Sequence, residues 1–174
     1  SLKLQTRAPV VVYTDAMWSP RECRLGAVVF LHGKPVAAGW ADLPTAWLNQ
    51  LEARGTQISP AETLGPAVAL ATWPNLLQDQ DIIFFCDNIG AVHSLAGGVA
   101  NAMDLQVLVS ATHAALAKAR ACWWIEWVPS ESNCSDGLSR EGIRDPWCQA
   151  HSLRPAPLRL PAWLVSLSGT MEQY

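Results

Sequence analysis

The chain has 174 residues, of which 50% are hydrophobic and 16% are charged. This length suits one domain with a sizeable core, and the hydrophobic content excludes global disorder. The formal net charge of −3 gives no general attraction to nucleic acid, so any such binding must come from a local patch. No apolar run approaches the ~20 residues that a membrane-spanning helix needs, so we expect no membrane partner.

The cysteines indicate a reducing environment. They are five in number, form no CxxC pair and lie mostly within apolar stretches: Cys23, Cys86, Cys122, Cys134 and Cys148. This pattern argues against a disulfide framework or a zinc site. The chain begins with neither a methionine nor a secretory signal pattern. We therefore expect an intracellular piece of a longer protein, in the cytoplasm or the nucleus.

Three strands are predicted first. The run PVVVYTD, residues 9–15, is rich in β-branched residues and ends at Asp15. LGAVVFLHG, residues 25–33, and VAAGW, residues 36–40, follow, and the sequence GKP marks a hairpin turn between them. We expect these strands to be antiparallel neighbours.

The next predicted element is helical. Residues 59–73, SPAETLGPAVALATW, have helical spacing and begin with a capping-box pattern, Ser59-x-x-Glu62. Pro66 implies a kink or a late helix start.

The most apolar stretch is IIFFCDN, residues 82–88. Five apolar residues lead into Asp87, which predicts a strand buried on both faces and therefore central in a sheet. Asn88 then opens an expected helix that Gly97 and Gly98 end. Asp87 is thus expected at the carboxyl end of a central strand, where open α/β sheets bind their ligands.

The remaining elements complete an α/β pattern. Residues 104–120 predict an amphipathic helix, and CWWIEWV, residues 122–128, predicts a strand. CSDGLSR, residues 134–140, predicts a short helix whose natural cap is Asn133. From about residue 141 the chain becomes Pro-rich. We divide it into a first domain, residues 1–140, which carries the candidate catalytic residues described below, and a Pro-rich C-terminal tail or linker packed on the domain, residues 141–174.

Four carboxylates lie at the ends of these elements: Asp15, Glu62, Asp87 and Asp136. Taken alone, each has a structural explanation. Asp15 suits a turn, and Asp87 suits a helix cap. Glu62 and Asp136 suit capping roles in the first turn of their helices.

Taken together, the four acids indicate a metal site. If their strands are neighbours, Asp15 and Asp87 face each other and repel, which raises one pKa. Glu62 and Asp136 would increase this repulsion unless divalent cations hold the cluster. Hard oxygen ligands select Mg²⁺ or Mn²⁺. Two such ions ~3.5–4 Å apart suit phosphodiester hydrolysis, with one activating water and one stabilising the leaving oxygen.

The motifs around these acids resemble those of a known family. VVVYTDA, ISPAETLGPAVAL, FFCDNIGAVHSLAGG and WVPSESNCSDGLSR are similar to the four motifs of the ribonuclease H domain of retroelement reverse transcriptases. The last is similar to the VPSxxNxADxxSR ending of DIRS-type and Pao-like elements, and the family is that of DIRS-type, Pao-like or gypsy-like retrotransposons. The resemblance covers about residues 9–140, and REGIRDPW, which follows, extends it more weakly.

The resemblance implies a fold and an activity. The fold is α/β and RNase H-like, with a five-stranded mixed sheet of order 3-2-1-4-5, strand 2 antiparallel, flanked by helices. The activity is hydrolysis of the RNA strand of RNA/DNA hybrids with two Mg²⁺ ions, for which Mn²⁺ can substitute. An upstream reverse transcriptase domain of the same polyprotein is the implied partner.

The resemblance also implies roles for the acids. Asp15 is similar to the carboxylate that bridges both metals. Glu62 and Asp87 resemble ligands of the ion at the leaving group, and Asp136 resembles a ligand of the water-activating ion. Cellular relatives carry a His in the loop before the last Asp; here WVPSES holds none, so that function is absent or moved to Glu131. The stretch GGVANAMD is also short and not basic, unlike the basic protrusion of cellular relatives.

Three further residues are candidates for substrate binding: Ser59, Asn88 and Arg140. Ser59 and Asn88 could donate to a 2′-hydroxyl or a phosphate, and each also suits a helix cap. Arg140 could contact a phosphate, although a cation is ordinary in a last helical turn. A non-catalytic RNase H-like scaffold or nucleic-acid-binding module is the alternative function. A transposase or integrase is less consistent with the acid order Asp, Glu, Asp, Asp.

Overall fold

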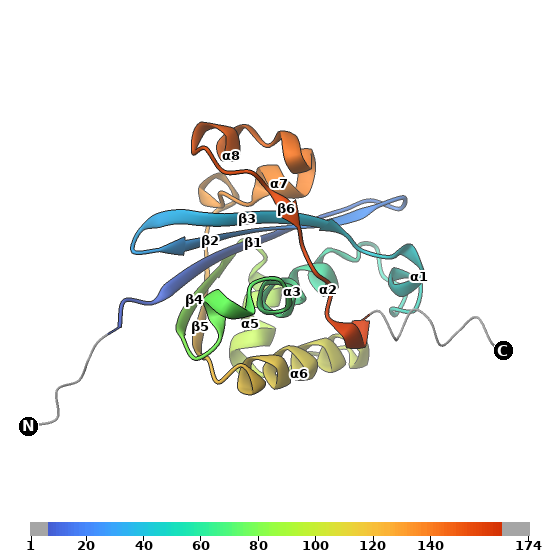
Figure 1. Cartoon of the computed structure of the whole chain (residues 1–174). Coiled ribbons are helices and arrows are strands. Elements are labelled where there is room, and N and C mark those ends of the chain that lie inside the picture. The colour runs from blue at the N-terminus through green and yellow to red at the C-terminus, as the bar shows by residue number, and fades with distance from the viewer. Residues whose placement is uncertain (1–6, 165–174) are drawn as a thin grey trace, which may run out of the picture.

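A six-stranded mixed sheet organises the molecule. The computed structural model describes residues 7–164, and the strand order in the sheet is β5-β4-β1-β2-β3-β6 (Figure 1). The strands β1, β2 and β3 are antiparallel neighbours, whereas β4, β5 and β6 each run parallel to the strand they join. The bounds are Val10–Trp18 for β1, Cys23–Leu31 for β2, Lys34–Asp42 for β3, Asp81–Cys86 for β4, Cys122–Trp127 for β5 and Ala156–Pro157 for β6.

The expected sheet order 3-2-1-4-5, with strand 2 antiparallel, is confirmed. The difference is β6, which pairs Ala156 with Gly39 and Pro157 with Trp40 of β3. The Pro-rich composition of this stretch predicted a tail or linker and no strand, since proline lacks the N–H donor of a strand interior. Proline is tolerated on an edge strand, which is where β6 lies.

Helices cover the two faces of the sheet unequally. The first six helices pack on one face, whereas α7 and α8 lie on the other (Figure 1). Their bounds are Thr45–Leu48 for α1, Ile58–Thr63 for α2, Gly65–Thr72 for α3, Pro74–Leu77 for α4, Ile89–Gly97 for α5, Met103–Lys118 for α6, Asp136–Glu141 for α7 and Pro146–Ala150 for α8. The 3-10 turns are Ser130–Ser132 for η1 and Gly142–Arg144 for η2. Within residues 7–164, no helix is long and apolar enough to cross a membrane.

The prediction that residues 82–86 are buried on both faces was wrong. Ile82, Phe84 and Cys86 are buried against the helices, but Ile83 and Phe85 on the other face are only half-buried. The reason is that α7 packs mainly on β1, β2 and β3. On that face Phe85 stacks on Tyr13, with ring centroids 5.0 Å apart.

The predicted helix over residues 59–73 is two helices, α2 and α3. Pro66 lies in the first turn of α3, as its missing N–H and fixed φ favour. Gly65 allows a close approach to β1, since a Cβ at this position would lie 2.8 Å from Cβ of Thr14. The break therefore brings α2 down onto the sheet, with its last turn facing β1.

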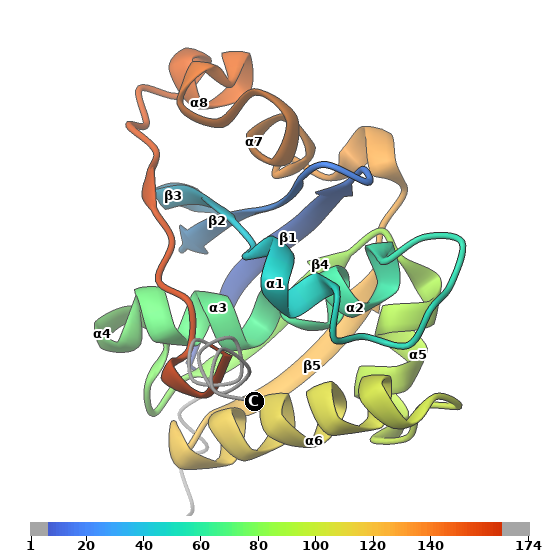
Figure 2. The ribbon, with the colours of Figure 1, turned by 90° about the vertical axis from the view of Figure 1, so that its right-hand side faces the viewer.

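The chain after residue 140 joins the two layers. It forms α8 on one face, passes the β3 edge as β6, and reaches the helices of the opposite face (Figure 2). There the Arg159 N–H donates to Oγ1 of Thr72 over 2.9 Å, and Leu158 and Leu164 are buried in the core. Residues 165–174 of the expected tail lie outside the described residues.

Candidate active site

Four acids from four separate elements line one open pocket of about 400 Å³. The pocket lies where β1 continues past the end of β4, because the pairing of these strands stops at Thr14 and Cys86. Asp15 is the next residue of β1, which extends to Trp18 rather than ending at Asp15 as predicted. The pocket lining is Asp15, Ala16, Met17, Trp18, Ile58, Glu62, Asp87, Asn88, Asp136 and Arg140.

Asp15 is held beneath α7. Opposite it on β2 is Gly26, where a Cβ would lie 2.7 Å from Cβ of Leu138, so glycine lets α7 lie directly on the sheet. The hydroxyl of Ser139 then donates to Oδ2 of Asp15 over 2.5 Å. Burial raises the pKa of Asp15 to about 7, against the lowering effect of the Ser139 hydrogen bond, and repulsion from Asp87 adds to the rise.

Glu62 is buried and points toward β1. Its Oε1 accepts the backbone N–H of Ala16 over 2.9 Å, and its Oε2 accepts the thiol of Cys86 over 3.4 Å. Because β4 has ended at this level, Glu62 satisfies an N–H that has no strand partner on that side. Burial raises the pKa of Glu62 well above its usual value, and repulsion from Asp15 adds to the rise.

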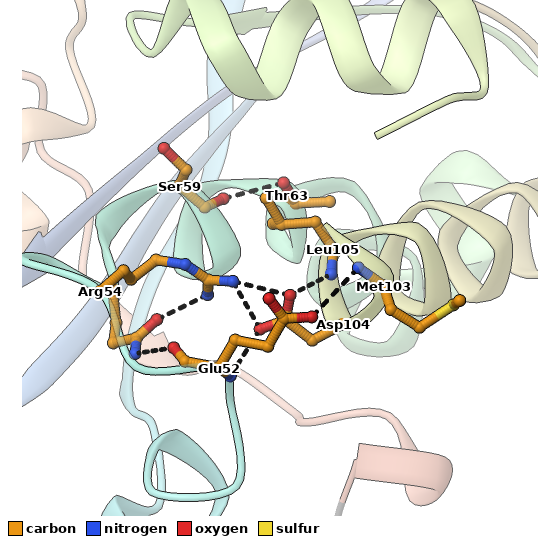
Figure 3. Close-up of polar contacts among 8 residues, drawn as sticks. Glu52, Arg54, Ser59, Thr63, Met103, Asp104 and Leu105 are labelled. Atoms are coloured by element: carbon orange, nitrogen blue, oxygen red, sulfur yellow. Dashed lines mark hydrogen bonds and ion pairs between the residues drawn. The ribbon is translucent and has the colours of Figure 1, made fainter. Parts of the chain in front are cut away.

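The predicted capping box of Ser59 and Glu62 was therefore wrong. The helix α2 begins one residue before Ser59, at Ile58, and its N-cap, Gln57, makes no side-chain capping bond. The Glu62 carboxylate is engaged by the sheet and is not at the helix start. Ser59 does not line the acid pocket; its carbonyl accepts the hydroxyl of Thr63 over 2.8 Å (Figure 3).

Asp87 and Asn88 follow β4 directly and are half-buried. Oδ1 of Asn88 accepts the N–H of Ala91 over 2.9 Å, which confirms the predicted cap of α5, and Gly98 ends this helix at a φ of 69°. Asn88 also lines the pocket. The Cys86 Sγ and carboxylate oxygens of Glu62 and Asp87 lie within 4.8 Å of one another.

Asp136 is the first residue of α7, and Arg140 lies one turn later. The Arg140 guanidinium contacts Oδ1 of Asp136 at 2.9 Å, and both residues line the pocket. The predicted cap Asn133 does not cap α7, because Ser135 is the N-cap. Instead, Nδ2 of Asn133 donates to the carbonyl of Thr14 over 3.0 Å, which ties the start of α7 to β1. Glu131 is exposed in η1 and does not line the pocket.

An ion-pair network supports the segment that leads into α2. Arg54 forms two hydrogen bonds to Asp104 of α6, at 2.7 and 2.8 Å (Figure 3). A third hydrogen bond joins Arg54 to Gln57 at 2.8 Å. The backbone N–H of Glu52 also donates to Asp104 over 2.9 Å. The network fixes residues 52–57 against α6 and so helps to place α2, which carries Glu62.

A second hollow of about 330 Å³ adjoins the acid pocket. Trp18 lines both, and Gln57 of the second hollow directly precedes Ile58 of the first. Its lining includes Arg21, Asn49 and Arg54. The two hollows are therefore neighbours, and the second carries cationic and amide side chains beside the carboxylate of Glu22.

The acid pocket fits a hard divalent cation. Its donors are carboxylate oxygens, which suit Mg²⁺ and Mn²⁺. Within residues 7–164, no lysine or arginine forms a salt bridge with Asp15, Glu62 or Asp87. Buried carboxylates without a cationic partner are costly, so a bound cation would relieve the repulsion among them.

Two contributors were missed from the sequence. Ser139 lies three residues after Asp136, a spacing that places it on the same side of α7, and this was the available signal. Cys86 directly precedes Asp87, but its contact with Glu62 comes from a distant segment, so no local pattern indicates it.

Comparisons with known proteins establish the fold. No family model matches the chain, and no curated protein matches its sequence. Among solved structures, it is similar to RNase H1 from the halophilic archaeon Halobacterium salinarum, with 24% identity and a TM-score of 0.62 over 79% of this chain and 99% of that one. It is also similar to the N-terminal RNase H domain of a Mycobacterium tuberculosis protein, with 22% identity and a TM-score of 0.61 over 83% and 99%.

A viral structure has the same fold within a longer chain. The foamy viral protease–reverse transcriptase, solved in complex with an RNA/DNA hybrid, matches with 15% identity and a TM-score of 0.54. The match covers 82% of this chain but only 21% of the viral one. The chain therefore has the RNase H fold, which occurs both in small RNases H1 and within a reverse transcriptase chain.

Proposed function

We propose that this chain is a metal-dependent endoribonuclease that hydrolyses the RNA strand of RNA/DNA hybrids. The observation that carries the proposal is the convergence of Asp15, Glu62, Asp87 and Asp136 in one pocket of an RNase H fold. A scaffold protein has no use for two buried, repelling carboxylates at this point, since their burial opposes folding. An enzyme that binds cations at this point does have a use for these carboxylates.

The four acids would hold two Mg²⁺ ions, or Mn²⁺ in their place. When bound, such ions supply an activated water and stabilise the leaving oxygen. Asp15 would serve both ions, Glu62 and Asp87 would hold the ion at the leaving group, and Asp136 would hold the ion that activates water. The protein's own contribution is orientation: the Ala16 N–H fixes Glu62, and the Asn133 amide fixes the approach of α7 to β1.

Hybrid binding would use the hollow beside the acids. Arg21 could contact a phosphate there, and Arg140 could contact a phosphate at the pocket itself. Asn88 lines the pocket and is the candidate donor to a 2′-hydroxyl. Ser59 remains a weaker candidate because its side chain does not line either hollow.

The biological setting is proposed from the motifs. VPSESNCSDGLSR is similar to the ending of DIRS-type and Pao-like ribonuclease H domains, so we assign the chain to a retroelement reverse transcriptase. The partner would be an upstream reverse transcriptase domain of the same polyprotein. The five cysteines are all unpaired and all lie within residues 7–164, consistent with a proposed reducing compartment.

A cleavage assay tests this function. A hybrid with end-labelled RNA is incubated with the chain and Mg²⁺ or Mn²⁺, beside double-stranded DNA, double-stranded RNA and an Asp87→Asn variant. We expect cleavage of the RNA strand of the hybrid alone, and none by the variant, whose folding is checked by circular dichroism. Equal cleavage by the variant, or none by the parent at high protein and metal concentrations, would overturn the proposal.

A further inference from the structure

Ser139 has a fully buried hydroxyl that lies between the carboxylate of Asp15 and the backbone carbonyl of Asp136. Its Oγ lies 2.5 Å from Oδ2 of Asp15 and 2.9 Å from the backbone carbonyl of Asp136. A hydroxyl carries a single hydrogen, and an ionised carboxylate can only accept. When Asp15 is ionised, the shorter contact is therefore a hydrogen bond that Ser139 donates to it.

This donor differs from the other groups around Asp15. Asp87 and Asp136 also face Asp15, but as acids they repel it and cannot fix its orientation when ionised. Ser139 is neutral and rigidly placed, because α7 packs directly on β2 at Gly26. One hydrogen bond uses one lone pair of Oδ2, so the other lone pairs of both oxygens remain available for cations.

We propose that Ser139 is a positioning residue that orients Asp15 for metal binding. The inference rests on the proposed function, in which Asp15 is the carboxylate shared by two ions. A carboxylate that serves two ions must have a fixed plane, and a hydrogen bond to one oxygen supplies this constraint. Without Ser139, Asp15 would be free to rotate away from its repelling neighbours, and cation affinity would fall.

Ser135 provides a matched control. It is also fully buried beside α7, and its hydroxyl donates to Oδ1 of Asn133 over 2.6 Å. Ser135→Ala thus removes an equally buried hydroxyl and a hydrogen bond of similar length, but one that ends on an amide and not on an acid. The backbone N–H of Ser135 still donates to the same Oδ1 over 3.2 Å in this variant, so Asn133 stays held. The two alanine variants separate a role in metal binding from general loss of stability.

The test is a titration of the metal-free protein with Mn²⁺, followed by electron paramagnetic resonance, for the parent and both variants. Outer-shell partners of metal ligands typically contribute about 10–100-fold in affinity. We expect Ser139→Ala to raise the Mn²⁺ dissociation constant about 10-fold, and Ser135→Ala to change it less than about 2-fold. In hybrid cleavage, the metal concentration for half-maximal rate should rise for Ser139→Ala, and excess metal should restore most of the rate.

The outcomes are distinguishable. Unchanged Mn²⁺ affinity in Ser139→Ala, or an equal loss in Ser135→Ala, overturns the role of Ser139. If Ser139→Ala does not fold, Ser139→Cys keeps the shape of the side chain with a larger atom and a weaker donor. Its Mn²⁺ affinity should lie between those expected for the parent and for a variant without a donor, and parent-like affinity overturns the role. If the parent cleaves no hybrid, the proposed function fails, while the Mn²⁺ titration still decides whether Ser139 positions Asp15.

Discussion

The acid pocket has an inner and an outer half that are built differently. The inner acids, Asp15 and Glu62, are 4% and 2% exposed, and each accepts a hydrogen bond from a fixed donor. The outer acids, Asp87 and Asp136, are half-buried and lie at the end of β4 and the start of α7. The inner half is thus part of the core, and the outer half is part of the surface.

The two halves therefore differ in their effect on folding stability and in how far their side chains can adjust. Burial raises the pKa of both inner acids, so in their ionised form they oppose folding. The outer acids are half-buried, so water reaches them. Fixed inner ligands with adjustable outer ones would let a cation site accept a substrate phosphate without rebuilding its core.

Removal of metal should have the largest effect. We expect no hybrid cleavage in EDTA, recovery with Mg²⁺ or Mn²⁺, and inhibition by Ca²⁺, whose looser coordination misplaces the attacking water. Calorimetry should detect Mg²⁺ or Mn²⁺ binding to the protein with hybrid present. Cleavage that persists in EDTA would mean that neither half of the pocket acts through a cation.

Substitution of an inner acid should have the next largest effect on hybrid cleavage. Asp15→Asn should slow cleavage by about 10³-fold or more, beyond the ~10–100-fold typical of an outer-shell partner. Glu62→Gln should behave likewise, although its amide oxygen can still accept the Ala16 N–H. Single-turnover rates at saturating Mg²⁺ measure both. Variants as fast as the parent would show that these acids serve the fold alone.

The stability of the metal-free protein should distinguish the two halves. The folded-state pKa of Asp15 is raised from 3.8 to about 7, so its contribution to stability is present below the unfolded value and is lost as the pH rises through about 7. Asp15→Asn removes this loss. Its thermal midpoint in EDTA should therefore exceed that of the parent by several degrees at about pH 8, and by much less at about pH 5.

Asp87→Asn is the outer-half control for this measurement. Because Asp87 is half-buried, its substitution should raise the midpoint less than Asp15→Asn at the same pH. Differential scanning calorimetry of the three proteins in EDTA gives the comparison. Equal midpoints for both variants would remove the distinction between inner and outer acids.

Salt dependence should show the smallest effect. With a net charge of −3 and few cations near the pocket, the chain should bind hybrid weakly, with a salt slope that reflects roughly 2–4 neutralised phosphates. Arg140→Ala should reduce that slope by about 1 if Arg140 contacts a phosphate. Fluorescence anisotropy at several salt concentrations measures it. Tight, salt-resistant binding by the isolated chain would contradict this expectation.

Much of the fold could be predicted from local patterns. The order of strands and helices follows from hydrophobic periodicity, and Asn88 and Gly98 bound α5 as their types suggest. The failures share a cause. Glu62 completes a capping pattern with Ser59, but the Ala16 N–H, which is distant in sequence, engages it instead. Local sequence patterns indicate which hydrogen bonds these groups can make, but not which partner the tertiary packing supplies.

The sequence predicts which acids form the candidate site, but it does not predict the contacts that they make. Motif spacing pointed to Asp15, Glu62, Asp87 and Asp136, which the structure brings to one pocket. The depth of each acid, and the donors Ser139 and Cys86, depend on how closely α7 and α2 approach β1. That approach is set by Gly26 and Gly65, which carry no chemical signal of their own.

The contact between Gly137 and Asp145 affects where the domain can be joined or trimmed. Asp145 is buried, its Oδ2 accepts the Cys148 N–H at the start of α8, and a Cβ at Gly137 would collide with its other oxygen. The residue next to Asp136 is thus braced by the segment after residue 140. A protease cut or an engineered fusion junction just after residue 140 would remove the support that Asp145 gives to Gly137. The position of Asp136 would then be disturbed, even though every proposed metal ligand would still be present.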